Sequence, residues 1–510
     1  MKILNKICLS YPKTLSFILG GIAVQALPPY YHWYLLFICF SVILYLIHKA
    51  QNLKQAFNYG YWYGFSFFAF GLFWVNNALL VDAPQTGWLV PIVFFASGGF
   101  FGLFIAIPSL LSKLNKSLYA QYLSLAAWIV IFEWIRSWFL TGFPWNLWGS
   151  CLAFNLPLIQ TASIFGTYGL SLFLILITSA PTLWYIHPSR KTAVLSTGIV
   201  LIGSCLLYGY GLYRIQKLND NSNSNITIRL VQPSIPQSLK WSPELSQKHF
   251  QQYINLSQSQ TLNNIDMVIW GETASPYMLD LDINARNQAL NAIADNSYLL
   301  TGLVRYHHDY YGSYQPLNSS LIINKSGQIE DFYDKSHLVP FGEYIPLREY
   351  LPSSIRPITN TITNFKSGNG PKIINLPNIP PFGIQICYEI IFPHHIIDSQ
   401  NKPQWLINLT NDGWYGISSG PYQHMVSTQL RAIEEGLTIV RSANSGISGI
   451  INRYGKILSS LNLNQTGILD ISLPQQLQVS TFYNNFGNFT TIILCLINIL
   501  ISAFINYKMK

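Results

Sequence analysis

Long apolar stretches dominate the first part of this chain and return at its end. A helix that crosses a bilayer needs about 20 predominantly apolar residues. Eight stretches approach that length, at residues 14–30, 31–48, 58–80, 88–111, 119–140, 160–186, 193–213 and 488–507. The pattern predicts a polytopic α-helical membrane protein with eight spans: seven transmembrane helices in an N-terminal membrane domain, 1–218, and a C-terminal transmembrane helix within 485–510.

Between residues 225 and 475 the pattern changes to short apolar runs separated by polar turns. The runs ITIRLVQP, DMVIWGE, YLLTGLVRY, FGIQICYE, WLINLTND and LTIVRSAN predict strands, and residues 243–263, 282–295 and 421–436 predict helices. Two hairpins are predicted to turn at NKSG, residues 324–327, and at RYGK, residues 453–456. Strands that alternate with helices and hairpins favour a layered α/β domain, which the polar linker NDNSNSN precedes.

The composition also indicates two different solvents. Half of the 510 residues are hydrophobic and a tenth are charged, whereas soluble domains carry about a quarter charged residues. The net charge of +9 comes from scattered Lys and Arg residues, which argues against a nucleic-acid partner. Five of the six cysteines lie in or beside apolar stretches, and Cys387 alone stands apart, so no disulfide framework is indicated. His394 and His395 have no further ligand cluster beside them, so neither a metal nor a cofactor is expected.

Basic residues in the loops predict how the chain is threaded through the membrane. They flank alternate loops: Lys2, Lys6, Lys13, Lys49, Lys54, Lys113, Lys116, Arg190, Lys191, Lys508 and Lys510. The intervening loops near Pro28, Asp82 and residues 141–157 contain no Lys or Arg. Basic loops tend to stay in the cytoplasm, so both termini are expected there and the 225–475 domain on the opposite side. Arg214 and Lys217 run against this trend.

One predicted span contains two ionisable residues, Glu133 and Arg136 in FEWIRSW. Their i, i+3 spacing places them on one helix face, where they can pair. Ionisable groups within a span are costly and are usually paired or functional. Two interpretations stay open: a structural pair near the outer end of the span, or an arginine that lies near a lipid phosphate.

Three residues with chemically reactive side chains lie at or near the ends of predicted strands in the α/β domain. Glu272 ends MVIWGE, Lys335 lies in FYDKSHLVPFGEY, and Cys387 ends GIQIC. Each alone is ordinary, because a lone cysteine after apolar residues is most often buried packing and a lone Glu or Lys at a strand end is usually solvated. Together they are chemically complete. A carboxylate can activate a thiol, and an ammonium can stabilise the oxyanion that forms when the thiol attacks an acyl group.

The order Glu, Lys, Cys and the segments IWGE, DKSHLVPFGEY and ICYE resemble the nitrilase, or carbon–nitrogen hydrolase, superfamily. This resemblance implies an α-β-β-α sandwich in which Glu272 is the general base, Lys335 stabilises the oxyanion and Cys387 is the nucleophile. It also implies supporting roles and substrate contacts for a second group of residues: Glu343, Tyr388 and Glu389 as supports, and Trp241 and Asn318 as substrate contacts. Glu343 could instead be a loop carboxylate that binds backbone amides, and Trp241 could simply pack.

With seven spans before this domain and one after it, the whole chain resembles a membrane-embedded branch of the superfamily, the N-acyltransferases that act on apolipoproteins in Gram-negative inner membranes. The segments EWIRSWFLTGFPWN, VQPSIPQSLKW, CYEIIFP, NLTNDGWYG and RSANSGIS carry this resemblance. It implies a ping-pong reaction in which Cys387 takes an acyl chain from a phospholipid as a thioester. The N-terminal α-amine of a diacylglyceryl-cysteine then accepts the chain, which gives a triacylated lipoprotein. The enzyme is expected to be a monomer of the cell inner membrane with a periplasmic catalytic domain.

One departure from the resemblance concerns the residue before the base. The family typically has proline there, whereas this chain has Gly271, and glycine leaves the backbone looser. Two other functions stay open. The domain could be a membrane-anchored nitrilase-type amidase with water as the acceptor, or an inactive domain of a transporter or scaffold. A transporter is disfavoured because charged residues within the predicted spans are almost confined to Glu133 and Arg136.

Overall fold

The computed structural model describes residues 10–187, 189–216, 223–308, 314–350, 357–359, 364–398, 401–475 and 480–508. Outside this described part lie Lys2, Lys6, Cys8, Lys217, Lys510 and residues 219–222 of the linker. The chain forms two compact units. A helical unit comprises Met1–Asn76, Pro84–Leu218 and Thr481–Lys510, and an α/β unit comprises Asn77–Ala83 and Asn219–Ser480.

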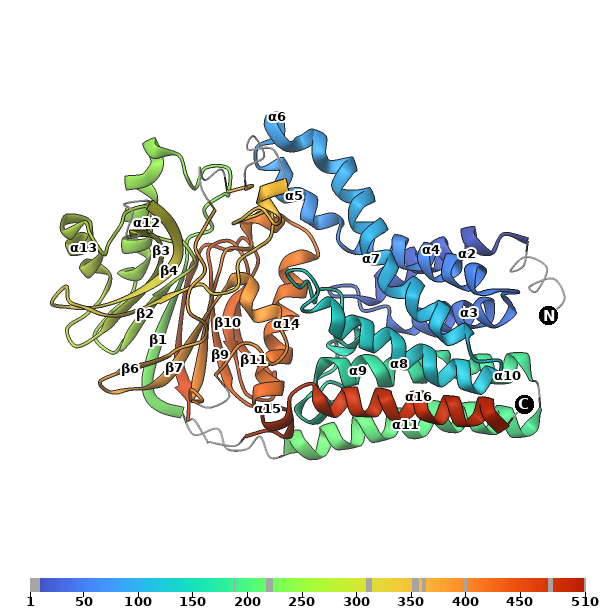
Figure 1. Cartoon of the computed structure of the whole chain (residues 1–510). Coiled ribbons are helices and arrows are strands. Elements are labelled where there is room, and N and C mark those ends of the chain that lie inside the picture. Colours follow the sequence, from blue (N-terminus) through green and yellow to red (C-terminus); the bar gives the residue numbers. More distant parts are fainter. Residues whose placement is uncertain are drawn as a thin grey trace. The chain divides into compact units, whose positions relative to one another are not determined.

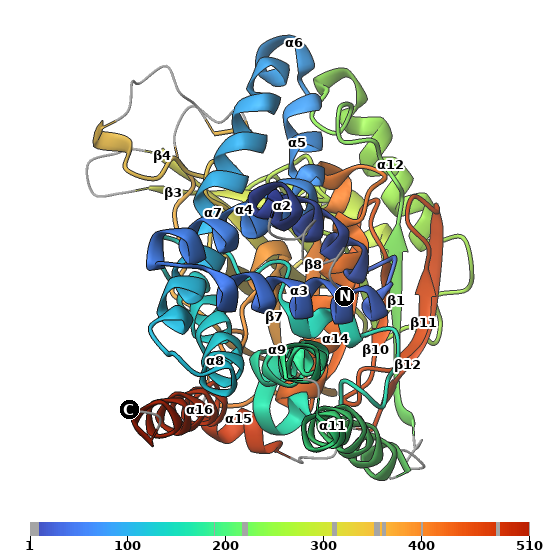
Figure 2. The ribbon, with the colours of Figure 1, turned by 90° about the vertical axis from the view of Figure 1, so that its right-hand side faces the viewer.

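Long apolar helices build the helical unit (Figures 1 and 2). They are α2 (Pro12–Ala23), α3 (Leu36–Lys49), α4 (Leu53–Gly71), α7 (Val90–Lys113), α8 (Leu118–Arg136), α9 (Ala162–Ser179), α11 (Arg190–Gln216) and α16 (Phe489–Lys508). Short helices adjoin some of them: α5 (Asn76–Leu80), α6 (Ala83–Thr86), α10 (Pro181–Ile186) and α15 (Phe482–Phe486). Figure 2 shows α9, α11 and α16 nearly end-on, so these three helices run in closely similar directions.

Five helices of the described part are long and apolar enough to cross a membrane: Ala83–Lys113, Leu118–Arg136, Ala162–Ile186, Arg190–Gln216 and Phe489–Lys508. A sixth span results if Leu53–Gly71 and Phe73–Leu80, bent by 42° at their junction, count as one. The prediction of eight spans is therefore not confirmed. The first two predicted spans fall short because turns around Pro28 and Pro29 take up part of the apolar sequence. They leave α2 with 12 residues and α3 with 14, and a helix of that length is only about 21 Å long.

The two ionisable residues of α8 brace a nearby turn. The Glu133 carboxylate accepts a hydrogen bond from the Trp148 N–H at 2.8 Å. Arg136 donates from one guanidinium nitrogen to the carbonyl oxygens of Phe143 and Trp145, both at 2.6 Å. Both side chains are almost fully buried. Both residues thus stabilise the turn through separate backbone contacts, and the ion pair between them and the contact with a lipid phosphate both stay predictions.

Two six-stranded sheets form the centre of the α/β unit (Figure 1). The first has the order β12-β1-β2-β3-β4-β5 and the second has the order β11-β10-β9-β8-β7-β6. The strands are β1 (Asn223–Gln232), β2 (Met267–Trp270), β3 (Tyr298–His308), β4 (Tyr314–Asn324), β5 (Ile329–Asp334), β6 (Ile373–Leu376), β7 (Ile379–Ile386), β8 (Trp405–Thr410), β9 (Thr438–Ala443), β10 (Ser448–Ile451), β11 (Ile457–Leu461) and β12 (Gly467–Pro474). In each sheet three neighbouring strands are parallel, β1-β2-β3 and β7-β8-β9, and the remaining pairs are antiparallel.

Successive side chains of a strand point to opposite faces of its sheet, so alternate residues pack into different apolar cores. Met267 and Ile269 of β2 join Ile384 and Ile386 of β7 in one apolar core between the sheets. Val268 and Trp270 face the other way, into a second core with the helices that cover the first sheet. These helices are α12 (Ser246–Ser257) and α13 (Ile283–Ala289), while α14 (Gly420–Glu435) packs on β9 and β10. The layers are helix, sheet, sheet, helix, which confirms the predicted nitrilase-like α/β domain.

All of the predicted strands and both hairpins are present, but some boundaries differ. Strands β6 and β12 were not predicted. Both are edge strands, and β12 is partly exposed along most of its length, which weakens the apolar signal. The predicted strand FGIQICYE is shifted along the chain, because β7 runs from Ile379 to Ile386 and Cys387–Ile391 forms a 3-10 helix, η10.

Candidate active site

The chain turns sharply where β7 ends. Cys387 follows directly, with a φ of 52°, in the left-handed region that residues other than glycine rarely adopt. The residue is 5% exposed. Its position at the carboxyl end of a parallel strand is where open α/β sheets carry their sites. A strained backbone at such a place is typical of functional residues.

Glu272 follows β2 of the first sheet in the same way. Its Oε1 atom accepts a hydrogen bond from Asn318 Nδ2 at 2.8 Å and lies 3.7 Å from Lys335 Nζ. Its other oxygen, Oε2, is buried and accepts no hydrogen bond within the described residues. One carboxylate oxygen is therefore held in place, and the other is able to receive a proton.

Gly271, where the family typically has proline, lies in a place where backbones come close together. A Cβ atom on it would approach the Ala443 carbonyl carbon and the Asn444 nitrogen to 3.1 Å. On its other side, the Gly302 N–H donates to the Gly271 carbonyl at 3.2 Å. A Cβ atom on Gly302 would lie 2.4 Å from the Thr273 nitrogen. The neighbouring strands therefore confine the backbone that glycine was expected to loosen.

Lys335, which follows β5, supplies the positive charge beside the carboxylates of Glu272 and Glu343. Its N–H donates to the Asn318 carbonyl at 2.9 Å, and its Nζ donates to Glu343 Oε1 at 2.9 Å. Burial alone would lower the pKa of this lysine, but the charges of Glu343 and Glu272 outweigh burial and raise it above its usual range. Lys335 therefore stays an ammonium at physiological pH.

Glu343 and Asn318 connect Glu272 to Lys335. The Asn318 amide donates to both carboxylates, at 2.8 Å each. Glu343 Oε2 also accepts the Val339 N–H at 2.8 Å. Glu343 thus combines the two interpretations of its sequence position, because one oxygen binds Lys335 and the other binds a loop amide. All of these contacts fix the relative positions of Glu272 and Lys335.

The electrostatic surroundings keep the thiol protonated. Burial, above all, raises the pKa of Cys387 to about 12. The charges of Glu272 and Asp412 act in the same direction, and the charge of Lys335 opposes them. A thiol with this pKa is uncharged near neutral pH, so it needs a base to become a nucleophile. The carboxylate whose charge acts most strongly on it is Glu272.

Glu389 braces the cysteine turn instead of lining an open pocket. One oxygen accepts the Ile386 N–H at 2.7 Å. The other accepts hydrogen bonds from Tyr333 Oη of β5 at 2.8 Å and from the N–H groups of Ser336 and His337, which follow β5, at 2.7 and 3.1 Å. Glu389 thereby ties the turn at Cys387 to the segment that carries Lys335.

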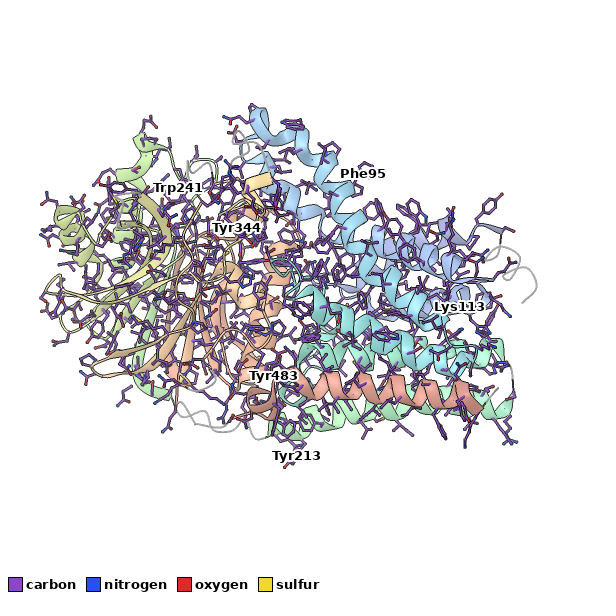
Figure 3. The ribbon with its side chains drawn as sticks, viewed as in Figure 1. Phe95, Lys113, Tyr213, Trp241, Tyr344 and Tyr483 are labelled. Carbon is purple, nitrogen blue, oxygen red and sulfur yellow. The ribbon has the colours of Figure 1, made fainter. Side chains whose placement is uncertain are left out.

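Tyr388 and Trp241 occupy very different surroundings. Tyr388 is buried, and its ring contacts the rings of His337 and Phe392. Trp241 lies in a turn that follows β1 and is 48% exposed (Figure 3). An exposed tryptophan contributes little to the core of its own domain. Trp241 therefore does not pack in the core of its domain, and its role as a substrate contact stays a prediction.

A buried charged cluster behind the cysteine was not predicted. Asp412 lies 2.8 Å from His424 Nδ1 and 2.7 Å from an Arg441 nitrogen. His424 Nε2 lies 3.1 Å from the carbonyl oxygen of Cys387. Burial would raise the pKa of the Asp412 carboxyl, but Arg441 and His424 hold it well below its usual range. The available signal was an aspartate and an arginine in or next to the apolar strands β8 and β9.

Comparisons with known proteins cover both units. The description "Apolipoprotein N-acyltransferase N-terminal domain" matches residues 19–180, and "Carbon-nitrogen hydrolase" matches residues 227–481. Two relatives are named "Apolipoprotein N-acyltransferase". The protein of Rhodopseudomonas palustris is 34% identical over 94% of this chain and 92% of its own length. The protein of Rickettsia typhi is 35% identical over 94% of this chain and 96% of its own length.

Among solved structures, an amidase of the nitrilase superfamily from Nesterenkonia AN1 is similar to half of the chain. The match has 15% sequence identity and a TM-score of 0.37, and it covers 50% of this chain and 92% of the amidase. The sequence relatives extend much further, because they match the membrane helices as well as the α/β unit. This chain therefore belongs to the apolipoprotein N-acyltransferase family, the acyltransferase branch of the carbon–nitrogen hydrolase superfamily.

Proposed function

We propose that this enzyme transfers an acyl chain from a phospholipid to the N-terminal α-amine of diacylglyceryl-cysteine in apolipoproteins. The observation that carries the proposal is the similarity to apolipoprotein N-acyltransferases over 94% of the chain. An amidase acting in water would need only the α/β unit. The apolar helices suit substrates that both reside in a membrane.

In the first half-reaction, Glu272 takes the proton from the Cys387 thiol. The sulfur attacks the ester carbonyl carbon of the phospholipid, and the carbonyl oxygen becomes an oxyanion that Lys335 stabilises. When this intermediate collapses, the bond between the carbonyl carbon and the alcohol oxygen breaks. Glu272 returns the proton to that oxygen, which leaves a lysophospholipid and a thioester on Cys387.

In the second half-reaction, the uncharged α-amine of the acceptor attacks the thioester carbonyl. Lys335 again faces the oxyanion. The carbon–nitrogen bond forms and the carbon–sulfur bond breaks, and the amine proton passes through Glu272 to the sulfur. The enzyme returns to its starting state, and no energy source is required because a thioester is converted into a more stable amide.

The proposed route predicts an isolable acyl-enzyme. Purified enzyme incubated with a phospholipid that carries a labelled acyl chain should gain one acyl group on Cys387, detected by mass spectrometry of the peptide. Addition of a diacylated lipopeptide with a free α-amine should then move the label to the lipopeptide. The same lipopeptide with an acetylated amine is the control and should accept nothing. Release of the label only as free fatty acid would instead favour the amidase.

We further propose that the enzyme is a monomer of the cell inner membrane, with both termini in the cytoplasm and the catalytic domain in the periplasm. The distribution of Lys and Arg in the loops supports this orientation. An alkaline phosphatase fused after residue 300 should therefore be active, since it folds only outside the cytoplasm. A fusion after Asn115, in the loop with Lys113 and Lys116, is the matched control and should be inactive. The reverse pattern of activities would contradict the orientation.

A further inference from the structure

A second buried lysine lies beside the catalytic base. Lys240 belongs to the turn at residues 237–241 that follows β1, and it is 6% exposed. Its Nζ donates to the main-chain carbonyl of Glu272 at 3.0 Å and to Thr273 Oγ1 at 2.8 Å. Lysines are rarely buried without a carboxylate partner, and within the described residues no ion pair satisfies Lys240. The cost of burying this charge points to a role beyond stability.

Lys240 holds a segment whose backbone is strained directly after the base. Gly271 precedes Glu272, and Thr273, which follows it, has a φ of 46°. A β-branched residue in this left-handed region is strained and persists only when surrounding contacts hold it. The carbonyl of Glu272 and the hydroxyl of Thr273 are the two groups that Lys240 binds. Its ammonium therefore restrains the main chain from which the catalytic carboxylate projects.

The same lysine connects the base to the exposed loop that carries Trp241. Its Nζ lies 5.9 Å from the centre of the Trp241 ring. Trp241 is thus exposed, whereas the side chain of the neighbouring Lys240 is buried and donates a hydrogen bond to the Glu272 carbonyl. Movement of this loop would shift the ammonium that restrains the base.

Three titratable groups from different elements face Lys240. Burial lowers the pKa of Lys240 to about 8, while the charges of Glu272 and Cys387 oppose this shift. The third group is His249 of α12, whose pKa is lowered by burial first and, in the same direction, by the charge of Lys240. Lys240 is therefore mostly an ammonium at neutral pH. It loses its proton at mildly alkaline pH, and with it one hydrogen-bond donor.

We infer that Lys240 is a positioning residue for the catalytic base. The protonated Nζ of Lys240 holds the Glu272–Thr273 backbone in the orientation needed for proton transfer from Cys387. The inference rests on the proposed function for the role of Glu272. It goes beyond that function by naming a group that makes the base effective without touching the substrate.

The test uses a reaction of Cys387 that needs neither lipid substrate. Iodoacetamide alkylates the sulfur and releases iodide, while the thiol proton passes to the base. The full-length enzyme in detergent is treated between pH 6 and 10, and alkylation of the Cys387 peptide is followed by mass spectrometry. The wild-type rate should rise toward pH 8 and then fall as Lys240 loses its proton.

Lys240→Met keeps most of the aliphatic stem and removes the donor. We expect its alkylation rate at pH 7 to be about 10- to 100-fold lower, with a steady rise with pH and no fall above pH 8. Lys240→Arg, which stays charged throughout this range, should recover part of the rate and also lack the fall. Lys248→Met, at an exposed lysine of α12, is the matched control and should behave as wild type.

A wild-type rate and pH profile in Lys240→Met would overturn the inference. If that variant does not fold, Lys240→Arg decides the matter, because an unchanged fall above pH 8 in this variant has the same consequence. These outcomes are separate from the proposed function. An enzyme that shows the expected alkylation profiles but gains no acyl group from phospholipid would refute the acyl transfer and leave the positioning role intact.

Discussion

The Cys387→Ser variant is expected to transfer acyl chains at least about a thousandfold more slowly than the wild type. Serine fits the space of the cysteine, so the tight turn at φ 52° should persist. The hydroxyl is a far weaker acid than even this buried thiol, and Glu272 cannot generate a useful amount of alkoxide from it. The measurement is the initial rate of label transfer from phospholipid to the diacylated lipopeptide.

The matched control for this variant is Cys205→Ser. Cys205 lies in α11 of the helical unit and is an exposed free cysteine. The same exchange of sulfur for oxygen there should leave the transfer rate unchanged. Transfer by Cys387→Ser at a rate near that of the wild type would contradict the thioester route. The mass of the Cys387→Ser protein should also stay constant in the presence of phospholipid.

Glu272→Gln should lower the rate of Cys387 acylation by about 100- to 10,000-fold. The amide has the shape of the carboxylate, and its oxygen can still accept the hydrogen bond from Asn318. It cannot accept the thiol proton, which is the step that a pKa of about 12 makes necessary. The loss should therefore appear in the single-turnover acylation rate, with the affinity for phospholipid nearly unchanged.

The pH dependence of Glu272→Gln gives a second readout with a defined sign. The charge of Glu272 helps to raise the pKa of the thiol, so its removal should lower that pKa. Without a base, reaction depends on the small fraction of thiolate, which grows about tenfold per pH unit below the pKa. The rate of the variant should therefore increase steadily from pH 7 to 9.

The matched control for this second variant is Glu330→Gln, in β5, which removes a carboxylate that hydrogen-bonds Asn324. It should acylate as the wild type does. A Glu272→Gln variant that retains the wild-type rate and pH profile would show that another group accepts the proton.

Two buried charged clusters surround the cysteine, and their energetic roles differ. The ammonium of Lys335 pairs with the carboxylates of both Glu343 and Glu272. Removal of either carboxylate would leave the buried positive charge of Lys335 less well neutralised. The cluster of Asp412, His424 and Arg441 approaches the carbonyl oxygen of Cys387 through His424 Nε2. Buried ions of this kind rarely increase stability over apolar packing. Their value here is a fixed geometry around the nucleophile.

The hydrophobic pattern was sufficient for the layered α/β domain and for the presence of membrane helices. The strands β2 and β7 are apolar runs bounded by turns, and such a local pattern indicates a strand before the tertiary structure is known. The number of spans was not predictable in the same way. The apolar residues between α2 and α3 have the hydropathy of a transmembrane span, but they form turns around Pro28 and Pro29.

The sequence by itself indicated the layered α/β domain, the family and three candidate site residues, Glu272, Lys335 and Cys387, because strand ends and motif order can be read along the chain. Only the tertiary structure decided what holds these residues. Glu389 reaches back to Ser336 across 53 residues, His424 reaches Cys387 across 37, and Lys240 reaches Glu272 across 32. Such contacts depend on which strands and loops become neighbours when the two sheets pack. A one-dimensional pattern carries no distance between residues so far apart in the chain.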